Sequence, residues 1–187
     1  MASSFSTNLK LELMTTGEKS GTWGTITNTN LQQLEQAASG YISIDVASSD
    51  VALAISNGAV SNGKNLYIKL TGTLGANRSV TIPDGAERII IFEDATTRGT
   101  SALYTITVKT VSGTGVVLPI GSKSLVYSDG TNVSLGIRSK GYVTLNSSTI
   151  TAYTAVDGDQ IFANTTANPI TVTLPASPCL LYTSPSP

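Results

Sequence analysis

Apolar and polar residues alternate along most of the chain after residue 40. In residues 42–46, 51–55, 66–70 and 104–108 every second residue is Ile, Leu, Val or Tyr. A period of two with many β-branched residues is typical of half-buried β-strands. Asn-Gly and Asp-Gly pairs, which favour turns, separate the segments; they begin at Asn57, Asn62, Asp84, Asp129 and Asp157. The pattern predicts a mainly β chain after residue 40.

A helical period precedes the strands. Leu31, Leu34 and Ala38 are spaced three and four residues apart, as on one face of a short helix. We predict that Asn30 caps its start and that Gly40 follows its end.

A glycine-rich segment leads into this helix. Gly17, Gly21 and Gly24 surround Trp23, which suggests a loop that lets the indole ring dock on a surface. Residues 1–40 are therefore either a lid on the chain's own domain or an attachment segment that docks on another protein, and an amphipathic pattern fits both. Trp23, Leu31 and Leu34 are the predicted docking residues.

An internal repeat organises the β region. Residues 40–41, 62–68 and 76–83 parallel residues 141–142, 157–163 and 167–175 in the same order, a repeat of about a hundred residues. We expect antiparallel β-sandwich-like modules in tandem. The first β module spans residues 41–138, and the second β module, truncated, spans residues 139–178.

One predicted strand is apolar on both faces, at Ile89, Ile90, Ile91 and Phe92. Such a strand must be covered on both sides, either inside a sandwich or against a neighbouring subunit. Burial in a core is the commoner arrangement. A subunit interface in a homotrimer is the alternative, and it would also protect sheet edges from aggregation.

Composition limits the chemistry. The chain of 187 residues has 12% charged residues, a net charge of −1, one cysteine and no histidine. These values exclude histidine-based catalysis, an internal disulfide and a cysteine-cluster zinc site, and they argue against nucleic-acid binding. Apolar runs are far shorter than the roughly 18 residues of a membrane span, so no membrane insertion is expected.

Acidic pairs do not suggest catalysis either. Glu93 and Asp94 are neighbours on a predicted strand and should point to opposite faces. Asp157 and Asp159 fit a turn better than a calcium loop, which needs further oxygen ligands. We predict no enzyme activity, no cofactor and no metal site. Exposed Tyr, Asn and Thr side chains can bind saccharides, but the sequence does not single out which.

The last nine residues, Cys179 to Pro187, differ sharply in composition from the preceding Thr- and Val-rich sequence. They resemble the translation of a sequencing adapter read through in frame. The alternative is a natural Pro-rich tail. We exclude residues 179–187 from the functional argument.

Motifs in the N-terminal segment resemble tail-fibre-like virion structural proteins of tailed bacteriophages, familiar from phages of marine bacteria. Residues 16–24 read Thr-Gly-Glu-x-x-Gly-x-Trp-Gly, and residues 27–31 read Thr-Asn-Thr-Asn-Leu. Residues 123–133 and 168–175 are similar to repeat units of phage fibres, and the resemblance covers most of residues 9–178. It implies a non-enzymatic virion component, often trimeric, that is anchored by its N-terminus and recognises the host surface.

We therefore expect a phage structural protein located in the virion, with other virion proteins as partners and a host surface glycan as a further candidate. One alternative is a carbohydrate-binding module or surface adhesin on the same scaffold. Another is a polysaccharide depolymerase carried on a phage spike, which would need convergent carboxylates.

Overall fold

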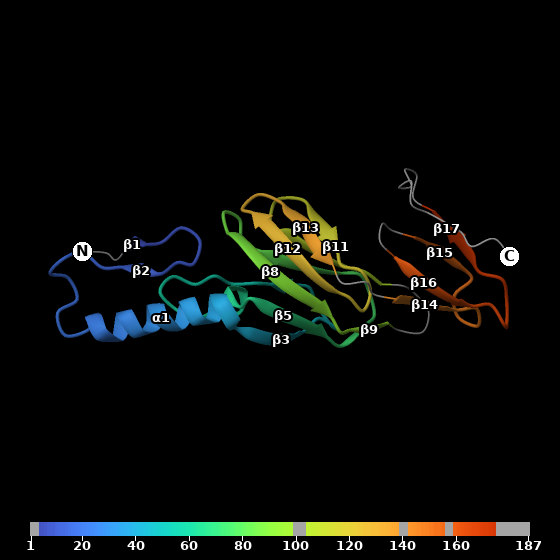
Figure 1. The fold of residues 1–187 in the computed structure, drawn as a ribbon, viewed down its shortest axis with the longest axis horizontal. Coiled ribbons are helices and arrows are strands. Elements are labelled where there is room, and N and C mark those ends of the chain that lie inside the picture. The colour runs from blue at the N-terminus through green and yellow to red at the C-terminus, as the bar shows by residue number, and fades with distance from the viewer. Residues whose placement is uncertain (1–3, 99–103, 139–141, 156–158, 175–187) are drawn as a thin grey trace.

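The computed structural model describes residues 4–98, 104–138, 142–155 and 159–174. The predicted tail at residues 179–187 and the predicted turn at Asp157 and Gly158 lie outside the described residues. An N-terminal segment, a large β module and a smaller β module follow one another along the long axis (Figure 1). The prediction of a mainly β chain with a helix near its N-terminus is confirmed.

The N-terminal segment combines a small hairpin with helix α1. Strands β1 (Ser4–Phe5) and β2 (Glu12–Leu13) pair antiparallel, and α1 spans Trp23–Ser39. The predicted helix start at Asn30 is wrong, because the Asn30 side chain binds β2 instead of capping a helix. Its Oδ1 accepts from the Glu12 main-chain N–H (3.0 Å), and its Nδ2 donates to the Glu12 carbonyl (2.9 Å). Trp23 is accordingly the first helical residue and not part of a loop.

The end of α1 agrees with the prediction, but for a different reason. Gly40 follows the helix in an extended conformation (φ −63°, ψ 138°), and its N–H donates to the Gln36 carbonyl (2.8 Å). A Cβ at position 40 would lie 2.3 Å from that oxygen and 2.7 Å from Asn65 Oδ1. Glycine is needed here because the chain passes so close to its neighbours, not because of a left-handed turn.

The first β module consists of two facing sheets. The five-stranded sheet has the order β13-β12-β8-β5-β3, and the four-stranded sheet has the order β11-β10-β7-β4. The strands are β3 (Tyr41–Asp45), β4 (Val51–Ala52), β5 (Tyr67–Thr71), β7 (Arg78–Ile82), β8 (Glu87–Asp94), β10 (Ile106–Thr110), β11 (Gly115–Val117), β12 (Lys123–Asp129) and β13 (Val133–Arg138), with a 3-10 turn η1 (Asn62–Lys64) after β4.

From β3 to β10, the strands of the two sheets alternate along the chain. Strands β3, β5 and β8 are parallel neighbours in one sheet, and β4, β7 and β10 are parallel neighbours in the other. Two short strands outside these sheets, β6 (Thr73–Leu74) and β9 (Thr97–Arg98), pair with each other and are also parallel. The expected antiparallel pairing holds for β8 with β12, β12 with β13 and β10 with β11.

The turn residues do not determine the strand direction. Asp84 and Gly85 join β7 in one sheet to β8 in the other, whereas Asp129 and Gly130 close a hairpin between β12 and β13. The same dipeptide thus serves both connections, and alternation of apolar residues is common to parallel and antiparallel strands.

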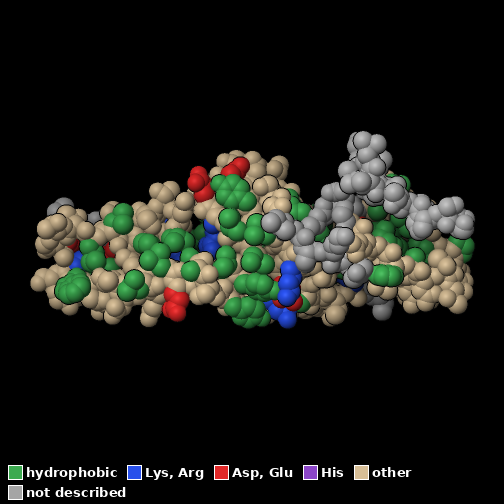
Figure 2. Space-filling view, in the orientation of Figure 1, with side chains coloured by type: hydrophobic (Ala, Val, Ile, Leu, Met, Phe, Trp, Pro, Cys, Tyr) green, Lys and Arg blue, Asp and Glu red, His purple; other side chains and the backbone are tan. Residues whose placement is uncertain are grey.

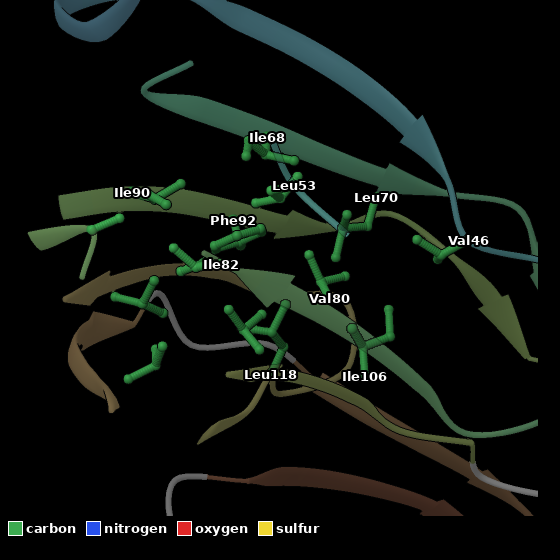
Figure 3. Close-up of a cluster of buried hydrophobic side chains, with 14 of the residues drawn as sticks. Val46, Leu53, Ile68, Leu70, Val80, Ile82, Ile90, Phe92, Ile106 and Leu118 are labelled. Carbon is green, nitrogen blue, oxygen red and sulfur yellow. The ribbon is translucent and has the colours of Figure 1, made fainter. Parts of the chain in front are cut away.

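The hydrophobic core lies between the two sheets (Figure 3). The five-stranded sheet contributes Ile68, Leu70, Ile90, Phe92 and Val126, and the four-stranded sheet contributes Val80, Ile82, Ile106 and Val108. All of them are at most 1% exposed. This continuous apolar layer stabilises the packing of the two sheets against each other.

The second β module repeats the start of the first. Strand β14 (Tyr142–Asn146) is parallel to β16 (Gln160–Asn164), and β15 (Ala152–Thr154) is parallel to β17 (Thr171–Thr173). The same relationships join β3 to β5 and β4 to β7. The repeat found in the sequence therefore corresponds to a repeated arrangement of parallel strands.

Candidate functional site

Helix α1 packs against the rest of the chain through polar side chains. Three carboxamides spaced three residues apart, Asn30, Gln33 and Gln36, make these contacts. Gln36 exchanges two hydrogen bonds with the main chain of Ser61, at 3.1 and 3.3 Å. Gln33 is the buried residue of the helix, with no exposed surface. The inward face of α1 is thus held by hydrogen bonds.

Three large apolar side chains of α1 are exposed, beside exposed polar residues such as Asn28, Gln32 and Glu35. Trp23, Leu31 and Leu34, which we call the helix stripe, are 63%, 57% and 43% exposed. A surface helix usually turns its large apolar side chains toward the core. The predicted docking residues therefore lie on the exposed side of the helix and play little part in the fold of this chain.

A second set of apolar side chains lies on the outer face of the five-stranded sheet, which Figure 2 shows together with α1. Tyr41, Tyr67, Ile91 and Leu125 are paired in register across β3, β5, β8 and β12. We call these four residues the sheet row. The Tyr41 and Tyr67 rings are in contact, with 5.7 Å between their centroids.

The two-sided strand is divided between core and surface. Ile90 and Phe92 are fully buried in the core, whereas Ile89 is 51% exposed and Ile91 half-buried on the outer face. Of the four residues predicted for a subunit interface, only Ile89 and Ile91 face outward. The other two are needed inside the module.

Charged residues border the sheet row. Glu93 is paired in register with Lys69 and Lys123, and its carboxylate lies 3.9 Å from the Lys69 ammonium group. It also accepts a hydrogen bond from the Tyr67 hydroxyl (2.6 Å). Burial and this hydrogen bond raise the pKa of Tyr67 to about 12. The row is therefore flanked by a line of alternating charges.

Buried Lys64 and half-buried Arg88 lie at the 3-10 turn η1, and the sequence offered no signal for them. The Lys64 ammonium group donates to Gln33 Oε1 and to the carbonyls of Ser56 and Ala59, the latter two at 2.7 Å. The Arg88 guanidinium donates to the carbonyls of residues 63–65. Burial and the charge of Arg88 lower the pKa of Lys64 to about 8, and burial lowers the pKa of Arg88 to about 10.

The acidic residues do not form a reactive cluster in the described ranges. Glu93 lies on the outer face, while Asp94 is buried and paired with Arg98 at 2.5 Å. Asp159 accepts a hydrogen bond from the Tyr153 hydroxyl (2.6 Å), and burial together with this bond raises the pKa of Tyr153. Among the described residues, no group of three or more His, Cys, Asp or Glu side chains is placed to hold a metal ion.

Comparisons with known proteins add no relative. The chain matches no protein-family model, no curated protein and no solved structure. Within the described part of the chain, no helix combines the length and the apolar character that crossing a membrane requires. The functional argument therefore rests on the chain itself, and above all on the helix stripe.

Proposed function

We propose that this chain is a structural component of a phage virion, a tail fibre or a related fibre or decoration protein. The observation that carries the proposal is the exposure of three large apolar side chains on α1, the helix stripe, while polar side chains hydrogen-bond the helix to the rest of the chain. Burying three large apolar side chains is favourable, so this exposed stripe suits a surface that another protein covers.

In the proposed arrangement the helix stripe anchors the chain to another virion protein. The β modules extend away from that anchor and form a shaft or a host-facing domain. In Figure 1 the N-terminal segment and the two β modules follow one another along the long axis, and this arrangement supports an anchor at one end with a shaft or host-facing domain beyond it. The resemblance of residues 16–24 and 27–31 to fibre proteins supports the same interpretation.

We further propose that three copies associate through the sheet row. Three of its residues are half-buried and Tyr41 is 60% exposed, so the row offers an apolar surface that identical subunits can cover, with Lys69, Glu93 and Lys123 at its border. A trimer would also cover the outer face of the five-stranded sheet.

Immunogold electron microscopy tests the proposal. Antibodies raised against the purified chain are expected to label tailed particles in a phage lysate or viral concentrate that contains the gene. Labelling confined to host cell surfaces would overturn the virion assignment and favour the surface adhesin, the second candidate. Pre-immune serum provides the control.

A further inference from the structure

The second β module leaves part of its core side uncovered. Val172 in β17 and Leu174 directly after it are 37% and 52% exposed. Val172 is paired in register with Tyr153 of β15, and side chains alternate along a strand, so Leu174 lies on the same face as Val172. Ala155, directly after β15, lies on that face as well and is buried. The two exposed residues therefore belong to the side of the sheet that faces the core.

The first β module shows how this side is covered. Strand β7 is the counterpart of β17, because it is parallel to β4 as β17 is to β15. Val80 corresponds to Val172 and Ile82 to Leu174, and both residues of β7 are at most 1% exposed. A third strand, β10, adds in parallel to β7 and contributes to the same core. An added strand thus accounts for the burial of this face in the first β module.

The edge of β17 beyond β15 carries no strand among the residues that the structure describes. Its sheet has the order β15-β17, with two strands only, whereas the corresponding sheet has the order β11-β10-β7-β4. The main-chain N–H and C=O groups on an open edge are a template for another strand, and a two-stranded sheet alone is only marginally stable. An apolar face and an open edge on the same strand are the combination that strand addition requires.

The strand that covers β7 defines the chemistry of the occupant. Ile106 and Val108 of β10 are fully buried in the core, and polar residues alternate with them. Val108 is paired in register with Val80, so the corresponding residue of an added strand would lie beside Val172. A segment that alternates β-branched apolar residues with polar residues therefore fits the edge of β17.

We propose that β17 binds a strand of this pattern from another virion polypeptide, added in parallel as β10 is added to β7. The inference rests on the proposed function in one respect, because the partner is taken to be a virion component. The second β module lies at the opposite end of the molecule from α1 in Figure 1, so the helix stripe can hold the chain at one end while the next component of a shaft attaches at the other. Covering Val172 and Leu174 is favourable, and the main-chain hydrogen bonds of the edge fix the direction of the added strand.

An NMR titration of the purified, ¹⁵N-labelled full-length chain tests strand addition. The probe is a synthetic peptide with the sequence of residues 104–110, which contains β10. We expect saturable shifts of the amide signals of Thr171, Val172 and Thr173. The control peptide carries Ile106→Asp and Val108→Asp and should shift none of these signals, because it would place carboxylates against the apolar face.

A nitroxide label at the N-terminus of the peptide reports the direction of the bound strand. In a parallel arrangement the label lies near the start of β17, so the amide signal of Thr171 should broaden more than that of Leu174. Stronger broadening of the Leu174 signal would mean antiparallel addition and would contradict the correspondence with β10.

Variants of the chain separate binding from folding. Val172→Asp should weaken peptide binding by about tenfold, since the carboxylate would be buried under the added strand. Leu174→Ser, a milder change, should weaken it by about threefold and keeps the test decisive if Val172→Asp unfolds the second β module. Val111→Asp, at an exposed valine of the first β module, is the matched control and should bind like the parent. Full affinity in Leu174→Ser and in a folded Val172→Asp chain, or no saturable shift with the parent chain, would overturn the inference.

Photo-cross-linking in particles identifies the partner. With p-benzoylphenylalanine in place of Thr173, an exposed residue of β17, irradiated virions should yield a cross-link to a different virion protein, at a segment that alternates apolar and polar residues. Cross-links confined to copies of this protein would overturn the assignment to another polypeptide. The titration needs no virion, so its outcome is independent of immunogold labelling. A chain that labels particles but binds no peptide retains the proposed function and loses only the strand-binding edge.

Discussion

Gln33 accepts a hydrogen bond from the ammonium group of Lys64, and neither side chain has any exposed surface. The pair joins the middle of α1 to the 3-10 turn that precedes β5. Among the residues that the structure describes, the partners of the Lys64 ammonium group are the Gln33 side chain and two main-chain carbonyls, and none is a carboxylate. A buried polar contact therefore fixes the helix on the β module and leaves the helix stripe exposed.

Replacing Lys64 tests this contact. Lys64→Met keeps the volume but leaves the acceptors of Gln33, Ser56 and Ala59 without a donor, so we expect a loss of about 3 kcal/mol in the free energy of unfolding. Lys109→Met, on the outer surface of β10, is the matched control and should change it by less than about 0.5 kcal/mol. Urea unfolding followed by circular dichroism measures both. Equal effects of the two substitutions would show that the buried ammonium group is not a structural contact.

The lowered pKa of Lys64 predicts a rise in stability with pH. Between pH 8, its value in the folded chain, and 10.5, its ordinary value, the unfolded chain binds more protons at this site than the folded chain. The free energy of unfolding should therefore increase as pH rises through this window. Above about pH 10 the raised pKa values of Tyr67 and Tyr153 act in the opposite direction. The rise between pH 8 and 9.5 should be absent in Lys64→Met, and a parent chain that loses stability there would contradict the assignment.

The two faces of α1 should respond in opposite ways to substitution. Asn30→Ala removes two hydrogen bonds to the Glu12 main chain and should cost about 1–2 kcal/mol of unfolding free energy. Leu31→Gln, at the adjacent but exposed position, should change it by less than about 0.5 kcal/mol. Thermal unfolding of the two variants measures the difference. A larger loss for Leu31→Gln would mean that the apolar face is used within the chain.

Much of the fold could be predicted from the sequence, because alternation at Ile68, Leu70, Val80 and Ile82 reports burial on one face of a strand. The direction of the strands could not be predicted, since parallel and antiparallel strands share the same two-residue alternation. The repeat was visible because both modules carry the same strand pattern.

The candidate site was only partly predictable. The spacing of Leu31 and Leu34 indicated an apolar helix face, but the choice between a lid and a docking surface depends on what the opposite face contacts. Those contacts join Asn30, Gln36 and Lys64 to residues distant in the sequence. The contacts of Arg88 with residues 63–65 could not be predicted, because a single cation beside an apolar run does not indicate what its side chain binds.

Association through the sheet row can be measured by light scattering on the purified chain at micromolar concentration. We expect a mass three times that of one chain, and Ile91→Asp should reduce it to that of the monomer, because a carboxylate would be buried without a partner. Val111→Asp, at a residue 58% exposed outside the sheet row, is the control and should leave the trimer intact. A monomeric parent chain would contradict the proposed trimer, while the anchoring role of α1 would remain open to its own test.

That test is the incorporation of a variant of the helix stripe into particles. Trp23→Ser, Leu31→Gln and Leu34→Gln are combined in one chain, and Val60→Ser, Val111→Ser and Val117→Ser, three exposed apolar residues of the first β module, form the matched control. Both proteins should unfold like the parent, because all six side chains are exposed. Quantitative mass spectrometry of purified virions should find the control at parental copy number and the stripe variant lost from the particles. Parental copy number of a folded stripe variant would contradict the account.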